Sequence, residues 1–369
     1  MVMALDRIRA VIKRRKYDAF LITQPENRRY VSGYAATDLS ISESSGALLI
    51  TAAGPAFLLT DFRYQQQAKT EAPHFEVVLY KHGLIRLLKQ LLPRLAIRNL
   101  AFESHYMLHS TAGLLQKMMD EINLSLVAAT GLVENLRLVK TAEELQKIEK
   151  SVLLNEAVFQ EIYAGLRPGL TEREVALEIE TVMRRKGADG KSFETIVAGG
   201  PNGALPHAVP TGRPLKIGEP IIIDMGLRLD GYCSDMTRTV VLGAPDPKTR
   251  KLFRLVRRAQ VAAIQAIKAG VDGRDIDTIA RRIIAQAGYG ENFGHSLGHG
   301  VGLAVHEGPS LSNRYRKKLR AGMVVTVEPG IYLPGWGGIR LENMVVVTQK
   351  GCQVLNRDTT LLELGRAGT

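Results

Sequence analysis

The chain has 369 residues, 45% of them hydrophobic and 23% charged, a composition typical of one large or two medium globular domains. Its 49 basic and 37 acidic side chains give a formal net charge of +12, divided as 16 basic against 11 acidic over residues 1–131 and 33 against 26 over the remainder. Because the excess is not concentrated in one segment, it favours a basic surface over a nucleic-acid partner.

The sequence favours neither a membrane nor a secretory setting. No apolar run is long enough to cross a bilayer, and residues 1–16 alternate charged with apolar side chains, as an amphipathic first helix does. The two cysteines, Cys233 and Cys352, lie on predicted strands and offer no disulfide framework. We therefore expect no membrane association and a reducing cytoplasm as the compartment.

Residues 1–131 alternate helix and strand patterns, which predicts a mixed α/β domain whose sheet is covered by helices. The predicted helices lie near residues 3–15, 63–71, 83–92 and 107–121. The predicted strands lie at residues 19–23, 46–50, 56–60, 75–80, 99–102 and 124–127. The segment carries no Gly-x-Gly-x-x-Gly or Walker sequence, so a nucleotide site is not expected.

Residues 132–369 form the second predicted domain. Two capping boxes, Thr141–Glu144 and Thr171–Glu174, begin its first helices. Two further helices are predicted near residues 248–269 and 275–287, and a glycine ends each of them. We expect these helices to cover one side of the strands that carry the acidic residues described next.

A first hairpin is predicted around Asp230-Gly231, a dipeptide typical of a two-residue turn between β-rich runs. With this turn Asp224 faces Thr237, and Asp224 and Asp235 become diagonal neighbours on one face, about 7–8 Å apart at the backbone. Two such carboxylates either face solvent or hold cations. The apolar residues 221–223 beside them favour burial, and therefore cations.

A second hairpin repeats the arrangement. Glu328 ends one β-rich run and Glu342 lies in the next, and the loop 334–338 between them consists of turn residues. The two glutamates have the same parity, which predicts that they share a face. His299 lies in a glycine-rich segment between the two hairpins. Four carboxylates and one imidazole suit a pair of Mn, Co, Fe or Zn ions better than a cysteine-type zinc site.

At these residues the chain resembles the pita-bread metallopeptidases, in particular the proline-directed branch of prolidases (Xaa-Pro dipeptidases) and aminopeptidases P. The matching motifs are Asp224-Met-Gly, Gly231-Tyr-Cys-Ser-Asp-Met-Thr-Arg-Thr239, Gly298-His-Gly-Val-Gly-Leu-Ala-Val-His-Glu307, Val327-Glu-Pro-Gly-Ile-Tyr332 and Gly338-Ile-Arg-Leu-Glu342. The resemblance covers essentially the whole chain. It implies a creatinase-like N-terminal α/β domain, residues 1–131, followed by a pita-bread catalytic domain, residues 132–369, of mixed α/β (α+β) class.

The resemblance also implies roles for individual residues. The five metal ligands would be Asp224, Asp235, His299, Glu328 and Glu342. The substrate and transition-state histidines would be His207, His295 and His306. Arg340 would form hydrogen bonds near the site, Glu328 would shuttle a proton, and Tyr332 is a weaker candidate for substrate binding. The family's usual Glu-Asp is Glu342-Asn343 in this chain, which leaves the ligand itself in place.

The implied activity is that of an exopeptidase that hydrolyses Xaa-Pro bonds at the N-terminus of peptides, or in Xaa-Pro dipeptides. A hydroxide bridging two divalent ions would attack, with Mn as the first choice of metal and Co, Zn or Fe as alternatives. Asp235 and Glu342 would bridge the ions. The expected partner is a peptide with proline at its second position, and the expected assembly is a homodimer. Dipeptidase and aminopeptidase activity both remain open.

Two other functions fit parts of the sequence. The segment 294–298 matches the Gly-x-Ser-x-Gly elbow of serine hydrolases, with Ser296 as nucleophile. The last histidine of the chain, His306, follows Ser296 with no acidic residue between them, so the triad order cannot be assembled. The second alternative is a metal-free binding protein on the same fold. Such a protein is expected to have lost ligands, whereas all five are kept here.

Overall fold

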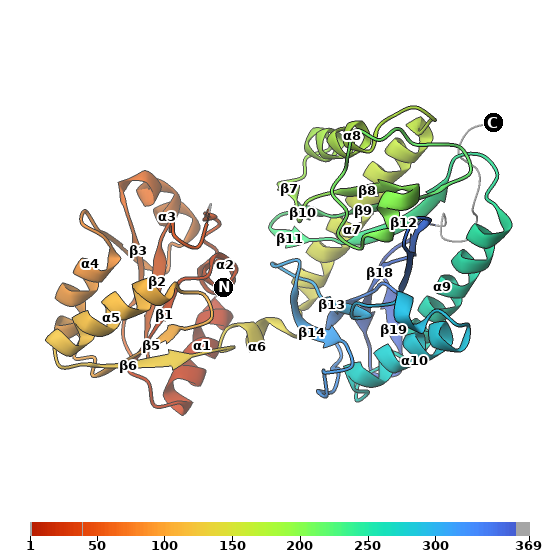
Figure 1. The fold of residues 1–369 in the computed structure, drawn as a ribbon. Helices are drawn as coiled ribbons and strands as arrows, with labels where there is room; N and C mark the ends of the chain where they lie inside the picture. Colours follow the sequence, from red (N-terminus) through yellow and green to blue (C-terminus); the bar gives the residue numbers. More distant parts are fainter. Residues whose placement is uncertain (1, 39, 359–369) are drawn as a thin grey trace. The chain divides into compact units, whose positions relative to one another are not determined.

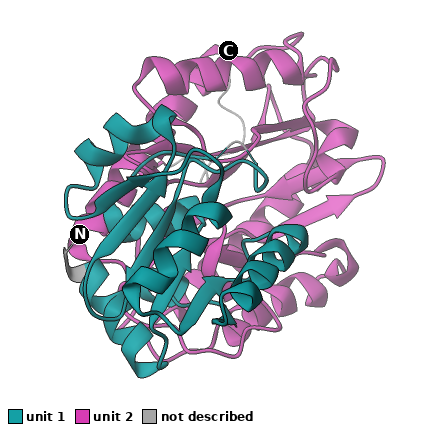
Figure 2. Ribbon diagram, turned by 90° about the vertical axis from the view of Figure 1, so that its left-hand side faces the viewer, with its two compact units in different colours: residues 1–137 teal, residues 138–369 magenta. Residues whose placement is uncertain are grey.

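The computed structural model describes residues 2–38 and 40–358, and the chain divides into two compact units, residues 1–137 and 138–369 (Figures 1 and 2). The contacts divide the chain after Arg137. The short helix α6 (Glu134–Arg137) belongs to unit 1, because the Arg137 guanidinium donates to Asn27 Oδ1 (2.7 Å) and the Tyr30 hydroxyl donates to Leu136 O (3.1 Å). Among the helices of the described residues, none is long and apolar enough to span a membrane.

Unit 1 is a six-stranded mixed sheet with helices on both faces, as expected (Figure 1). Its strands, in the order β4-β3-β2-β1-β5-β6, are β1 (Ala19–Ile22), β2 (Ala47–Thr51), β3 (Ala56–Thr60), β4 (Glu76–Leu79), β5 (Asn99–Glu103) and β6 (Ser125–Ala129). Besides α6, its helices are α1 (Val2–Arg14), α2 (Pro25–Ser32), η1 (Phe62–Tyr64), α3 (Gln65–Glu71), α4 (Leu84–Leu91), η2 (Leu92–Leu95) and α5 (His109–Glu121).

Unit 1 has two hydrophobic cores, one on each face of its sheet, because successive side chains of a strand point to opposite faces. Phe20 and Ile22 of β1 pack in one core with α1, α2 and α3, whereas Ala19 and Leu21 pack in the other with α4 and α5. Each strand residue therefore faces a different helical layer from its neighbour. Neither the short helix α6 nor helix α2 was predicted from the sequence. The pattern missed α2 because its buried positions include the polar Asn27 and Arg28 rather than an apolar stripe.

Unit 2 contains four sheets, ordered β12-β9-β8, β11-β10-β7, β14-β13-β15-β18-β19 and β16-β17. The strands are β7 (Gly190–Lys191), β8 (Ile196–Gly199), β9 (Pro220–Met225), β10 (Leu227–Leu229), β11 (Tyr232–Cys233), β12 (Met236–Val241), β13 (Gly298–Gly300), β14 (Glu307–Leu311), β15 (Val324–Val327), β16 (Gly330–Leu333), β17 (Gly337–Arg340), β18 (Asn343–Val347) and β19 (Cys352–Val354). The helices are α7 (Ala142–Gly165), α8 (Glu172–Arg185), η3 (Gly200–Ala204), α9 (Pro247–Ala266), α10 (Gly273–Gln286) and η4 (Gly290–Asn292).

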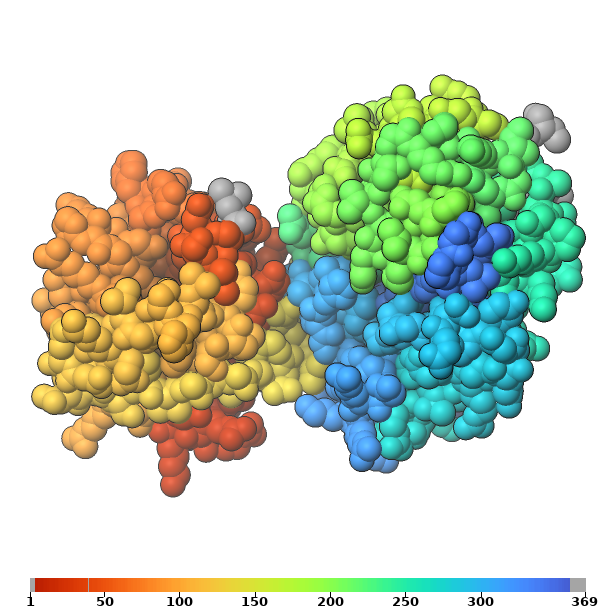
Figure 3. Space-filling view, in the orientation of Figure 1, coloured from red at the N-terminus to blue at the C-terminus, as the bar shows by residue number. Residues whose placement is uncertain are grey.

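Each hairpin of unit 2 is covered by its own pair of helices. Helices α7 and α8 share a buried core with β9, β10 and β12, and helices α9 and α10 share another with β15, β16, β17 and β18. Segments far apart in the sequence lie side by side, as the green and light blue surfaces of Figure 3 illustrate; Cys233 N–H, for example, donates to Gly302 O (2.8 Å). The strands of the two hairpins thus lie next to each other in unit 2, with a pair of helices packed against each hairpin.

Candidate metal centre

The first hairpin has the predicted register. Asp230 (φ 49°) and Gly231 (φ 81°) both adopt left-handed backbone angles, as a type I′ turn requires. Asp224, near the end of β9, pairs with Thr237 of β12, which puts Asp235 opposite Gly226. A Cβ atom at Gly226 would lie 2.3 Å from Ser234 O, so only glycine allows the strands to close at this point.

In the second hairpin the two glutamates face each other directly. Val327 pairs with Asn343 and Gly330 pairs with Arg340, so Glu328 stands opposite Glu342. Both lie between short strands, β15 and β16 on one side and β17 and β18 on the other. The two carboxylates are therefore held on adjacent strands at one point of the hairpin.

His299 enters the same space from β13. Its Nδ1 lies 3.1 Å from Gly300 O and donates to it, which leaves Nε2 as an acceptor aimed at the carboxylates. Nε2 lies 3.5 Å from Asp235 Oδ2 and 3.4 Å from Glu328 Oε1. Burial lowers the pKa of His299 to about 4, so the imidazole is neutral at pH 7, the form that binds a metal ion.

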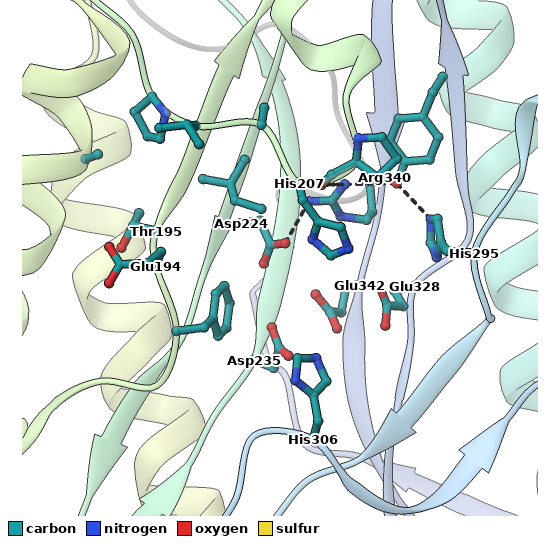
Figure 4. A pocket seen from close by; sticks show the side chains of 18 of the residues that line it. Glu194, Thr195, His207, Asp224, Asp235, His295, His306, Glu328, Arg340 and Glu342 are labelled. Carbon is teal, nitrogen blue, oxygen red and sulfur yellow. Dashed lines mark hydrogen bonds and ion pairs between the residues drawn. The ribbon is translucent and has the colours of Figure 1, made fainter. Parts of the chain in front are cut away.

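All ten residues predicted for the site line one cavity of about 690 Å³ in unit 2. In Figure 4 the carboxylates of Asp224, Asp235, Glu328 and Glu342 point toward a common centre between His207 and His306. One donor atom each from Asp235, His299 and Glu342 lie within 4.8 Å of one another. The structure therefore brings the predicted ligands together.

The electrostatics of the cluster demand a cation. Burial raises the pKa values of Asp235 and Glu328 well above their usual range, and the neighbouring carboxylates raise them further. The same causes raise the pKa of Glu342 to about 8. Asp224 Oδ1 and Glu342 Oε1 are buried without a hydrogen-bond partner among the described residues. Divalent ions would supply both the missing charge and the missing contacts, so these residues fit a metal centre.

A chain of hydrogen bonds borders the carboxylates on one side. Arg340 donates from Nη2 to Asp224 Oδ2 (2.6 Å) and from Nη1 to the Tyr332 hydroxyl (2.9 Å). That hydroxyl lies 2.8 Å from His295 Nε2, and His295 Nδ1 lies 2.8 Å from Ser296 O. Burial lowers the pKa of His295 to about 4, so its neutral ring donates from Nδ1 and accepts the tyrosine proton at Nε2.

His207 and His306 flank the centre from opposite sides (Figure 4). His207 follows η3, which lies against β17 so closely that a Cβ atom at Gly338 would be 2.1 Å from Gly203 O. The ring of His306 lies 4.3 Å from the ring of His299, centroid to centroid. His207 is thus placed against the second hairpin, and His306 against the histidine of β13.

Two threonines of the site were not predicted from the sequence. The Thr237 hydroxyl donates to Glu342 Oε2 (2.8 Å), and the Thr326 hydroxyl donates to Glu328 Oε1 (3.2 Å). Thr326 Oγ1 also accepts the backbone N–H of His299 (3.1 Å). Their spacing in the sequence could have indicated them. Thr237 lies two residues after one ligand and Thr326 two residues before another, and side chains two residues apart on a strand share a face.

The serine-hydrolase alternative lacks its structural context. Ser296 lines the cavity, but it lies on an irregular loop that leads into β13. A nucleophile elbow needs a strand before the serine and a helix after it. The segment 294–298 has neither, so its Gly-x-Ser-x-Gly pattern is incidental.

Comparison with known proteins agrees with the geometry. Residues 146–349 match metallopeptidase family M24, and residues 5–139 match the creatinase/prolidase N-terminal domain. The chain is similar to the structure of an Xaa-Pro dipeptidase from Bacillus anthracis (37% identity, TM-score 0.91, covering 98% of this chain and 99% of that one). It is also similar to an X-Pro aminopeptidase from Thermotoga maritima MSB8 (38% identity, TM-score 0.84, 94% and 97% covered). An Xaa-Pro dipeptidase of Pyrococcus horikoshii is 34% identical over 356 residues, 95% of this chain and 97% of the relative.

The fold and the cluster together define a metal-dependent peptidase with a creatinase-type N-terminal domain and a pita-bread catalytic domain. The chain belongs to metallopeptidase family M24 and is a metallo-exopeptidase, which confirms the resemblance inferred from its motifs.

Proposed function

We propose that the chain is a dinuclear exopeptidase that hydrolyses the Xaa-Pro bond at the N-terminus of peptides or in Xaa-Pro dipeptides. The observation that carries the proposal is the convergence of four carboxylates, two buried and two partly buried, and the neutral His299 in a cavity that three further histidines line. The similar solved structures include both an Xaa-Pro dipeptidase and an X-Pro aminopeptidase, so the proposal covers both activities.

Five residues would hold two divalent ions, manganese first, with cobalt, zinc or iron as alternatives: Asp224, Asp235, His299, Glu328 and Glu342. Asp235 and Glu342 would bridge, since these two are buried whereas Asp224 and Glu328 are partly exposed. When bound, such ions lower the pKa of a water molecule to near neutrality and polarise the scissile carbonyl.

The remaining residues act on the substrate and its protons. Burial lowers the pKa of His306, so at pH 7 its neutral imidazole donates an N–H to the oxygen that becomes negative during attack. Glu328 would take a proton from the attacking water on a carboxylate oxygen and pass it to the leaving proline nitrogen. Arg340 fixes Asp224, and Tyr332 fixes the ring of His295. His207 and His295 contact the substrate.

The experiment that tests the function compares peptides after reconstitution of the metal-free protein with each candidate metal. Leu-Pro and Leu-Pro-Gly should be cleaved in a metal-dependent manner, and Leu-Ala and Leu-Ala-Gly far more slowly. Equal rates on the proline and alanine peptides would indicate a general aminopeptidase. Peptide binding without bound metal would indicate the metal-free binding protein. The ratio of the two proline substrates distinguishes dipeptidase from aminopeptidase activity, and light scattering checks the proposed homodimer.

A further inference from the structure

One buried amide side chain of helix α9 forms hydrogen bonds with the hairpin that carries two of the proposed ligands. Gln260 is fully buried, and its Nε2 donates both to Val327 O (3.1 Å) and to Leu341 O (3.0 Å). Val327 directly precedes Glu328, and Leu341 directly precedes Glu342. A single side chain thus links the two strands at the position of the facing glutamates.

Pro329 explains why the hairpin needs this link. In the register of the hairpin Pro329 stands opposite Leu341, and Leu341 N–H reaches Pro329 O at 3.4 Å. Opposite residues of an antiparallel pair can exchange two such bonds, but proline has no N–H with which to return the second. The Gln260 amide donates to Leu341 O in its place.

The orientation of the amide is set within α9. Arg257, one turn earlier on the helix, donates from Nη1 to Gln260 Oε1 (2.6 Å). The oxygen of the amide is thereby engaged on the helix side. Its NH₂ group must then face the strand carbonyls, where it has two acceptors.

The first hairpin shows the same device from its own helix. Asn155 of α7, buried, donates from Nδ2 to Met225 O (2.9 Å), and Ser151 donates to Leu227 O (3.1 Å). These carbonyls flank Gly226, which separates β9 from β10 two residues after Asp224. Each ligand-bearing hairpin is thus held at its irregular point by a buried amide from the helix behind it.

We propose that Gln260 is a positioning residue of the metal centre, which holds the backbones of Glu328 and Glu342 at the separation that the ions require. Asn155 does the same for Asp224. The inference rests on the proposed function, because it assumes that these carboxylates bind the ions. It predicts that the amides control metal affinity, beyond any part they have in folding.

The test replaces Gln260 with leucine and titrates the metal-free protein with Mn²⁺ by calorimetry. Gln260→Leu should bind Mn²⁺ about 10–100-fold more weakly, the range seen when groups that orient metal ligands are removed. The rise in melting temperature on adding Mn²⁺ should shrink accordingly. Thr249→Val is the matched control, because Thr249 is equally buried on α9 and its hydroxyl forms no hydrogen bond with the hairpin among the described residues. The control should bind Mn²⁺ as the wild type does.

A second substitution can restore the missing donor. Pro329→Ala supplies a backbone N–H opposite Leu341 O, so Gln260→Leu/Pro329→Ala should regain part of the lost affinity. If Gln260→Leu does not fold, Arg257→Met provides the test, because it frees the amide without removing it and should weaken Mn²⁺ binding in the same direction by a smaller factor.

Wild-type Mn²⁺ affinity in Gln260→Leu, or in Arg257→Met when only that variant folds, would overturn the inference and leave Gln260 a purely structural residue. Failure of the proposed function looks different. In that case the wild-type protein itself binds no Mn²⁺ and shows no metal-dependent cleavage.

Discussion

Asp235 has the most crowded electrostatic environment of any residue in the centre. Its carboxyl group is fully buried, and Glu342, Asp224 and Glu328 all raise its pKa, in that order after burial itself. The guanidinium of Arg340 acts in the other direction. Without ions this side chain disfavours the fold, and with them it becomes a ligand.

Asp235→Asn tests this double role. The change is nearly isosteric, but asparagine offers one neutral carbonyl oxygen in place of a charged carboxylate. We expect one metal site to empty, turnover to fall by several orders of magnitude and circular dichroism to stay native-like. The melting temperature of the metal-free protein should rise, because one of four crowded carboxylates is gone. Two bound metals per chain with near-normal turnover would show that Asp235 is not a bridge.

A second buried acid lies in unit 1, which contains none of the proposed ligands. Glu103 Oε2 accepts the backbone N–H groups of Thr23 (2.7 Å) and Gln24 (2.8 Å), and Oε1 accepts from Asn27 Nδ2 (2.7 Å). These bonds favour the charged form, yet burial outweighs them and raises the pKa of Glu103 to about 7. The group therefore titrates near neutral pH in the folded protein.

The sign of the resulting pH dependence follows from linkage. Between the ordinary value of 4.5 and about 7 the folded protein binds more protons at Glu103 than the unfolded chain does. Its stabilising contribution is complete below 4.5, declines as the pH rises and is lost above about 7, a change of about 3 kcal/mol in the free energy of unfolding. Between pH 5 and 8 the melting temperature of the metal-saturated protein should decrease more steeply for the wild type than for Glu103→Gln. Parallel curves would contradict the assignment.

At the scale of elements, the hairpins were predictable and their supports were not. A turn dipeptide and the parity of Asp224, Asp235, Glu328 and Glu342 depend only on local geometry, and the observed registers agree. The amide of Gln260 meets its hairpin through tertiary packing, which no local pattern indicates. Its type, a polar residue in an otherwise apolar helix face, was the one available signal.

Helix α2 also could not be predicted from a local pattern. Its buried face carries Arg28, which is fully buried and pairs with Asp38 (2.9 Å) while also donating to Ser45 Oγ (2.7 Å). A helix buried through hydrogen bonds and an ion pair has no apolar stripe to reveal it. Periodicity therefore predicted the helices that bury apolar side chains and missed this one.

The loop that carries His306 depends on a buried ion pair. Lys140 Nζ lies 2.9 Å from Glu307 Oε1, with both side chains less than a tenth exposed, and Glu307 Oε2 also accepts Ala304 N–H (3.3 Å). A Cβ atom at Gly302 would lie 2.5 Å from Glu307 Oε1. The residues between β13 and β14 are thus folded around this one carboxylate.

Removing the lysine should destabilise the protein, and a second substitution should restore part of the stability. Lys140→Met takes away the ammonium that faces the buried Glu307 carboxylate, and we expect a loss of about 3–5 kcal/mol in the free energy of unfolding. Lys140→Met/Glu307→Gln should recover a large part of it, because the buried charge is then gone. Chemical denaturation of these two variants and of Glu307→Gln alone measures the coupling. Additive losses would mean that the pair contributes little.

At the scale of the whole molecule, apolar side chains are exposed where the cavity opens. Leu177 (66% exposed) and Val209 (75%) both line the cavity, and Leu205 (58%) lies next to Pro206, which also lines it. Exposed apolar groups that gather at a cavity mark a surface that a ligand covers. We expect peptides with a large apolar side chain to be preferred.

Val209→Ser should therefore raise KM several-fold for Phe-Pro peptides, with less effect on Ala-Pro peptides and little change in kcat. Ile217→Ser is the matched control, because Ile217 is 70% exposed and does not line the cavity. Steady-state kinetics on the four combinations of variant and peptide give the answer. The same change in KM in both variants would show that the apolar residues at the cavity opening do not determine specificity.

The crowded carboxylates also bear on how much of the protein a cell keeps. A ligand that binds only the folded chain stabilises it in proportion to the logarithm of its free concentration. Cellular proteases remove chains in step with their unfolded fraction, so a stability change of about 1–2 kcal/mol alters abundance several-fold. With four carboxylates at one buried point, the amount of this protein should follow the supply of divalent metal, even where its synthesis does not change.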